Sequence, residues 1–132
     1  MANRNEMHTR VETYTAEVAA VKYGFVKQGT AADGCILPTA ATDQALGIAL
    51  DDAAIGERVP VLIEGSTWVI DMDGTLNTGD AVSVGDGAAE YHKATIAAST
   101  NPVTGVVVGE DAGSADDLVL VQITAGYKPI LA

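Results

Sequence analysis

The stretch LGIAL at residues 46–50, with VPVLI at residues 59–63, decides the fold because the same pattern is written again later in the chain. The second copy reads GVVV at residues 105–108 and LVLVQI at residues 118–123. In each copy a glycine opens a short apolar strand, a loop rich in Ala, Gly and Asp follows, and a β-branched strand returns. This pattern is typical of a β-hairpin, and its duplication predicts a small all-β scaffold.

Length and composition indicate one domain with a narrow core. The chain has 132 residues, and its apolar content comes from Ala, Val, Ile and Leu, with only one Phe and one Trp. We expect an all-β fold, a small single-domain β-barrel or β-sandwich of short antiparallel strands with an extended N-terminal arm. Residues 1–17 are assigned to the arm and residues 18–132 to the β-rich domain.

Turn-forming residues recur at short intervals and leave little room for a helix. One such turn is expected at Glu64-Gly65-Ser66, and residues 93–98 are predicted to form a single helical turn. Cys35 is the only cysteine, which excludes a disulfide within the chain, and it is predicted to be a small buried strand residue. His8 and His92 have no ligand partner at metal-binding spacing, so we expect no transition metal and no cofactor.

The net charge of -11 is unevenly distributed. Residues 1–28 carry four basic and three acidic side chains, whereas residues 29–127 carry fifteen carboxylates against Arg58 and Lys93. Such an acidic body repels nucleic acid, so no direct nucleic-acid binding is expected. No apolar run is long enough to cross a membrane and no signal-type stretch follows Met1, which predicts a soluble protein made in a host cytoplasm.

The nearly neutral leading segment is predicted to touch a partner. Residues 1–10 are polar and aperiodic, whereas residues 11–16 alternate and can pair as an edge strand or add to the sheet of a neighbour. Tyr14 and Tyr23 are candidate aromatic anchors, with plain packing in the core or on the surface as the alternative for both. The candidate partner-binding residues are Arg10, Val11, Thr13, Tyr14, Thr15 and Tyr23.

The stretch WVIDMDGTL at residues 68–76 resembles the first motif of haloacid dehalogenase-type phosphatases. In that family the first Asp is the nucleophile and the second a general acid/base, which would make Asp71 and Asp73 a Mg²⁺-dependent pair. The motif lies in the middle of the chain, and a turn and a short strand follow it where the enzyme needs a helix. We therefore favour a hairpin, with a strand at residues 66–72, a turn at Asp73-Gly74 and a second strand at residues 81–84. No enzymatic activity is expected.

Residues 18–123 resemble the capsid decoration, or cement, proteins of tailed bacteriophages, similar to lambda-type head decoration proteins. The segments that carry this resemblance are ALGIALDDAAIGE at residues 45–57, VPVLIEG at 59–65, LNTGDAV at 76–82 and VTGVVV at 103–108. The long lead at residues 11–27 and the acidic residues at 71–73 depart from that pattern, so no arm contacts are carried over.

The resemblance implies a structural virion protein, without a cofactor, that binds the outer surface of the expanded head and cements neighbouring major capsid proteins. It implies a homotrimer whose partners are the major capsid protein and itself, with no membrane contact. Its location would be the outer surface of the capsid, after synthesis in the cytoplasm of the bacterial host. The alternatives are another structural β-module of a virion, on the tail or receptor side, and the Mg²⁺-dependent phosphatase that uses Asp71 and Asp73.

Overall fold

The computed structural model describes residues 6–87, 89–98 and 101–123, and all regular structure within them is β-strand. The all-β prediction is therefore confirmed. The nine strands of the described chain are β1 (Met7–Ala16), β2 (Phe25–Gln28), β3 (Gly34–Ile36), β4 (Gly47–Ala49), β5 (Arg58–Ile70), β6 (Ala81–Val84), β7 (Ala94–Ile96), β8 (Gly105–Val107) and β9 (Leu118–Ile123).

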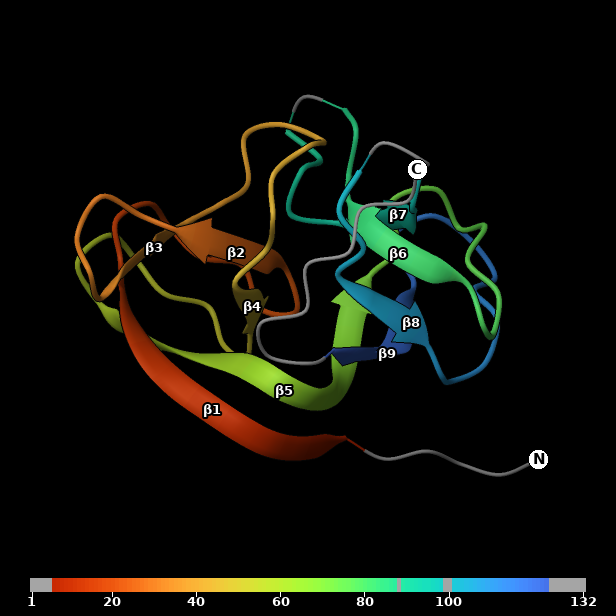
Figure 1. The fold of residues 1–132 in the computed structure, drawn as a ribbon, viewed down its shortest axis with the longest axis horizontal. Helices are drawn as coiled ribbons and strands as arrows, with labels where there is room; N and C mark the ends of the chain where they lie inside the picture. The colour runs from red at the N-terminus through yellow and green to blue at the C-terminus, as the bar shows by residue number, and fades with distance from the viewer. Residues whose placement is uncertain (1–5, 88, 99–100, 124–132) are drawn as a thin grey trace.

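The strands form one sheet that is organised around the long strand β5, which runs from one group of strands into the other (Figure 1). The sheet order is β1-β3-β2-β4-β5-β9-β8-β6-β7, and β1 also pairs with β5. Because β1 pairs with both β3 and β5, the first five strands close a ring. Asp71, directly after β5, bridges to Ala94 of β7, so the end of β5 closes a second ring with β6 to β9.

The two rings are copies of one unit. We define the first unit as β1 to β4 with the Arg58–Leu62 part of β5, and the second unit as the Gly65–Ile70 part of β5 with β6 to β9. Five backbone hydrogen bonds of the first unit have a counterpart in the second. In each pair below, the first residue donates its N–H to the carbonyl oxygen of the second, and the bond in the first unit is followed by its counterpart in the second unit. They are Ala16–Glu57 and Asp71–Asp117, Leu46–Val26 and Thr104–Val82, Ala49–Gly24 and Val107–Asp80, Leu50–Pro60 and Val108–Leu120, and Gly56–Ala16 and Asp116–Asp71. β5 therefore closes the first unit and opens the second.

Both hairpins expected from the duplicated sequence pattern are confirmed. Ile48 pairs with Leu62 across β4 and β5, and Val106 pairs with Gln122 across β8 and β9. The opening glycines are needed because the returning strand passes very close to them. A Cβ on Gly47 would lie 2.2 Å from the Leu62 carbonyl oxygen, and one on Gly105 would lie 2.5 Å from that of Gln122.

The hydrophobic interior has two parts, and the second one joins the units. The first core fills the ring of the first unit with small residues, namely Ala16, Ala20, Val26, Cys35, Ala49, Ala53, Val59, Val61 and Ile63. The second core contains Phe25, Ala45, Ile48, Leu62, Val69, Leu76, Val82, Val84, Ala94, Val107, Val119, Val121 and Ile123. Because Phe25, Ile48 and Leu62 come from strands of the first unit, this core ties the two units together. Cys35 is buried, as predicted.

Three local expectations are wrong. The turn at Glu64-Gly65-Ser66 is the middle of β5, where Gly65 bends the strand with φ +129° and lies against the Met7 carbonyl of β1. The helical turn at residues 93–98 is instead β7, which pairs with β6. The hairpin expected over residues 66–84 does not form, because that part of β5 pairs with β9 while β6 pairs with β7 and β8.

The segment predicted as an arm contributes a strand to this sheet. β1 runs antiparallel along β5, from Met7 opposite Ser66 to Thr15 opposite Arg58, with a bulge around Arg10. Its last residue, Ala16, is fully buried in the first core. A role of this segment as an arm toward a partner stays a prediction.

Candidate functional site

The outer edge of β1, the edge that faces away from β5, is open over its central residues. The Ala16 N–H donates to the Glu57 carbonyl on the β5 side, whereas the Thr15 N–H donates to the Asp33 carbonyl on the opposite side. Because N–H groups alternate along a strand, those of Val11 and Thr13 point away from β5. In the described residues, β1 pairs on its outer edge only at Thr15 and Ala16, with β3.

The main-chain groups of Val11 and Thr13 are therefore presented to the surroundings in the pattern that an added antiparallel strand needs. Val11 is exposed over 40% of its surface, and Thr13 is also exposed. One long contact reaches this edge, from Arg58 Nη2 to the Thr13 carbonyl oxygen at 3.4 Å. At that length it competes weakly with a well-formed strand hydrogen bond.

The even-numbered side chains of β1 are engaged within the protein. The Arg10 guanidinium donates to the Glu12 carboxylate, through Nε at 2.8 Å. The half-buried Tyr14 packs against the first core, and its hydroxyl donates to Glu12 at 3.3 Å. Burial, and then the nearby Glu12 carboxylate, raise the pKa of Tyr14. Tyr14 therefore packs against the core, which is one of the two alternatives that the sequence left open for it.

At the closed end of the edge, Thr15 takes part in a surface network. Arg58 Nη1 donates to Thr15 Oγ1 at 2.8 Å and to Asp33 Oδ2 at 3.1 Å. The Arg58 and Asp33 side chains are well exposed, so their ion pair contributes little to stability, but the network marks where the open edge ends.

Tyr23 lies away from β1, on the turn that precedes β2. Its φ of 67° is left-handed, its N–H donates to the Ala49 carbonyl, and its carbonyl accepts the Ile70 N–H of β5 at 3.2 Å. The Lys22 ammonium lies 5.1 Å from the centre of its ring. The structure thus gathers five of the six candidate residues on β1 and places Tyr23 against the far end of β5.

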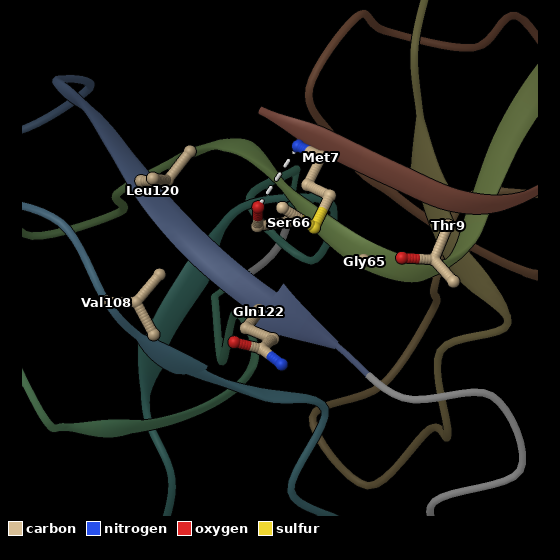
Figure 2. Close-up of a pocket in the computed structure, with 7 residues that line it drawn as sticks. All are labelled: Met7, Thr9, Gly65, Ser66, Val108, Leu120 and Gln122. Carbon is tan, nitrogen blue, oxygen red and sulfur yellow. Dashed lines mark hydrogen bonds between the residues drawn. The ribbon is translucent and has the colours of Figure 1, made fainter. Parts of the chain in front are cut away.

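A shallow groove that the sequence did not reveal lies where β1 begins, between the two units (Figure 2). Its volume is about 270 Å³, and it is lined by Met7, Thr9, Gly65, Ser66, Val108, Leu120 and Gln122. Met7 donates its N–H to Ser66 Oγ at 3.1 Å, while its side chain stays 68% exposed. These residues are distant in the chain, and only the alternation in β9 could have indicated that Leu120 and Gln122 share one side.

Asp71 and Asp73 form a structural turn rather than a reactive pair. Asp71 is fully buried, and its carboxylate accepts the N–H groups of Asp73 at 3.0 Å and Leu76 at 3.1 Å. Asp73 accepts a hydrogen bond from Thr95 Oγ1 at 3.3 Å. Throughout the described chain, no three His, Cys, Asp or Glu side chains gather as metal ligands would. The structure gives the phosphatase interpretation no support.

No helix among the described residues is long and apolar enough to span a membrane.

Comparison with solved structures finds a protein with a similar fold. The fold is similar to that of a structure described as the head fiber gp8.5 N base in bacteriophage phi29, with a TM-score of 0.63. The two chains are 20% identical, and the match covers 87% of this chain and 93% of that one. At this identity the likeness shows the fold alone. No curated protein matches the sequence.

The fold and the open strand edge fit a structural β-module. A family model described as "Structural cement protein (E217 gp24/Pam3 gp6)" matches residues 1–124. The chain belongs to this structural cement protein family of phage capsids, which confirms the resemblance to capsid cement proteins. It is a structural protein of the virion, located with the capsid and bound to capsid protein.

Proposed function

We propose that this protein binds the outer surface of the expanded phage head as a homotrimer and holds neighbouring major capsid proteins together there. The observation that carries the proposal is the open outer edge of β1, at Val11 and Thr13. Within a cement family, an edge strand that keeps its main-chain groups available offers a direct way to add to the sheet of a capsid protein. The contact residues remain Arg10, Val11, Thr13, Tyr14, Thr15 and Tyr23.

A strand paired with Val11 and Thr13 would complete four main-chain hydrogen bonds. At a net contribution of about 0.5–1.5 kcal/mol each, they supply about 2–6 kcal/mol before the ordering of the partner is subtracted. One such contact is weak. Because the contacts repeat over a particle and several belong to one oligomer, binding of the first subunit raises the effective concentration of the others.

The charge distribution supports the outer rather than the inner surface of the shell. Residues 29–127 carry fifteen carboxylates and two basic side chains, which repel the phosphates of packaged DNA. On the outside the same carboxylates face water. The nearly neutral segment that contains β1 is then free to approach the capsid protein without this repulsion.

Binding to capsids tests the proposal directly. Purified protein is mixed with undecorated capsids before and after expansion, and the particles are reconstructed by electron microscopy. We expect regular density on the outside of expanded capsids only. Density on the tail, inside the shell, or at no position on the capsid would contradict the proposal.

A single substitution tests the strand edge. Thr13→Pro removes the N–H that points outward while leaving every hydrogen bond to β5 in place, since proline is tolerated at a strand edge. Thr13→Val is the matched control, because it keeps both the N–H and the β-branched shape. We expect weaker binding to expanded capsids for Thr13→Pro alone, with both variants folded by circular dichroism. Equal binding of the two variants would show that this edge is not used.

A further inference from the structure

One face of the sheet in the second unit is largely apolar and belongs to neither core. Val69, Val107, Val119 and Val121 point into the second core, so the residues that alternate with them point outward. These outward residues define what we call the outer face. They are Ser66, Trp68 and Ile70 on β5, Leu118, Leu120 and Gln122 on β9, and Val106 with the adjoining Val108 on or beside β8. Figure 2 shows Val108, Leu120 and Gln122 side by side along this face.

The outer face is mainly apolar and carries no charge. The registers place Val106, Gln122 and Ser66 in one row and Leu120 beside Trp68 in the next. Leu118 is 45% exposed and Val106 38%, Trp68, Ile70 and Val108 are half-buried, and Leu120 and Ser66 between them are buried. None of the eight residues carries a charge in a chain whose net charge is -11. An apolar face whose rim residues are partly exposed in this way offers an interaction surface.

At three positions of the outer face, the first unit shows that the fold does not require an apolar residue. The matched hydrogen bonds align Trp68 with Thr13, Ile70 with Thr15, and Leu118 with Arg58. At these three positions the first unit carries two threonines and an arginine, whereas the positions that match Val106, Val108, Leu120 and Gln122 hold Ile48, Leu50, Pro60 and Leu62. Trp68, Ile70 and Leu118 are therefore not needed to form the unit and are available for a contact outside the domain.

We propose that the outer face is the surface through which copies of this protein contact one another. The proposal deepens the proposed function, since it assigns an interface to the oligomer assumed there. The negative charge of the chain indicates which partner the outer face binds. Two copies of a strongly acidic chain repel wherever their carboxylates approach, so they meet most favourably over a surface that has none. A basic partner would instead select the loop at residues 109–117, which places Glu110, Asp111 and Asp116 at the end of this face.

The arrangement separates two contacts on one small domain. The open edge of β1 belongs to the first unit, whereas the outer face belongs to the second. A half-buried Trp68 flanked by Ile70 and Leu118 gives the rigid aromatic centre with an apolar surround that subunit interfaces use. Self-association therefore leaves the strand edge available to a capsid protein.

The test measures self-association of the full chain without any capsid. Sedimentation velocity of the wild-type protein is compared with Leu118→Arg, which installs the residue type found at the matching position Arg58, and with Val106→Lys. Both sites are exposed, and thermal unfolding checks the fold. Ile55→Arg is the control, because Ile55 is 70% exposed but lies on the first unit. We expect an oligomer for the wild type and the control, and monomers for the two face variants. A monomeric wild type, or face variants that stay oligomeric, would overturn the proposal.

Salt and capsid binding separate this proposal from the proposed function. Added NaCl screens the repulsion between acidic copies, so self-association should stay constant or strengthen. Weakening by salt would overturn the proposal in favour of a charge-driven contact. Leu118→Arg should still occupy expanded capsids, with lower avidity. If the wild type forms oligomers through this face but binds no capsid, the interface stands and the capsid-binding proposal fails.

Discussion

The two units of this domain have the same backbone fold, but the side chains that they present on their surfaces differ. Five pairs of backbone hydrogen bonds correspond between them, and the hairpins β4–β5 and β8–β9 have the same register. Their surfaces have diverged. The first unit presents an open strand edge with threonines and Arg58, and the second presents Trp68 and Leu118. The comparison teaches that hydrogen-bond register and a few close approaches fix the unit, while the outward positions are free to take on separate contacts.

The residues with a left-handed backbone conformation also correspond between the two units. Gly56 in the first unit matches Asp116 in the second, and Tyr23 in the first matches Gly79 in the second, and all four have positive φ. Each unit therefore keeps one of these turns with glycine and one without it. The side chains of Tyr23 and Asp116 are held at a conformational cost that glycine would avoid.

The largest effect is expected where the two units share a core. Phe25 is fully buried, lies on β2 of the first unit and packs in the second core. Phe25→Ala should destabilise the protein by about 3–5 kcal/mol, through lost apolar contact and the cavity left behind. Urea unfolding followed by fluorescence and circular dichroism should show one shared transition at lower urea. Two separate transitions would mean that the units fold independently.

The next largest effect tests whether Gly47 and Gly105 are equally necessary for the close approach of the strands in the two hairpins. Gly47→Ala and Gly105→Ala each place a Cβ against a carbonyl oxygen, at 2.2 Å and 2.5 Å, so a strand must shift. We expect a loss of about 2–3 kcal/mol at each site, with Gly47 the more sensitive. Gly87→Ala is the control, since a Cβ there would lie 3.8 Å from Glu90 Cγ, an ordinary contact distance. A tolerated substitution at one glycine and not the other would show that the two hairpins differ in packing.

A smaller effect isolates backbone conformation. Gly56 and Gly79 have φ values of +88° and +93°, with no atom within 4 Å of the position of a Cβ. Alanine at either site should therefore cost about 1 kcal/mol from left-handed strain alone. Asp116→Ala, at the position that matches Gly56, keeps the same strain and should lose only its contact with Lys93. Chemical denaturation compares the three, and an unchanged stability for Gly79→Ala would refute the strain argument.

The sequence predicted what depends on local pattern. Apolar alternation and turn residues were enough for both hairpins, and the burial of Cys35 followed from its neighbours. Gly65 was wrongly predicted to lie in a turn, because a glycine between polar residues indicates a turn. In the structure this glycine instead makes room for the carbonyl of Met7. The helical turn expected at residues 93–98 failed because pairing with β6 overrides the weak local preference of a short segment.

The candidate site was predictable only in part. Alternation at residues 11–16 indicated an edge strand, and the structure finds the outer edge of β1 open there. It could not indicate that β1 is held by β5, because a pairing over about 50 residues of intervening chain leaves no local pattern. The outer face was also hidden, since the outward residues of β5, β8 and β9 become one surface only when the second ring closes.

The smallest expected effect concerns Lys93, a basic side chain of the second unit that has no counterpart in the first. Lys93 Nζ lies 2.7 Å from Asp116 and 2.6 Å from Glu90, and these hydrogen bonds, with Asp116 first, raise its pKa. A raised pKa means that the stabilisation is complete below the ordinary lysine value and is lost as pH rises through the folded-state value. Because the pair with Asp116 is largely hydrated, Lys93→Met should cost about 1 kcal/mol or less at neutral pH.

This difference between Lys93→Met and the wild type should shrink at alkaline pH and in high salt. Thermal unfolding across that pH range measures it, with Lys22→Met as the control, since Lys22 lies over the ring of Tyr23 and away from this network. The first unit has Gly34 at the position of Lys93, and there the Glu17 carboxylate accepts the N–H groups of Thr30 and Ala31 instead. A loss at Lys93 that does not change with pH would mean that its aliphatic stem, rather than its charge, holds the end of the second unit.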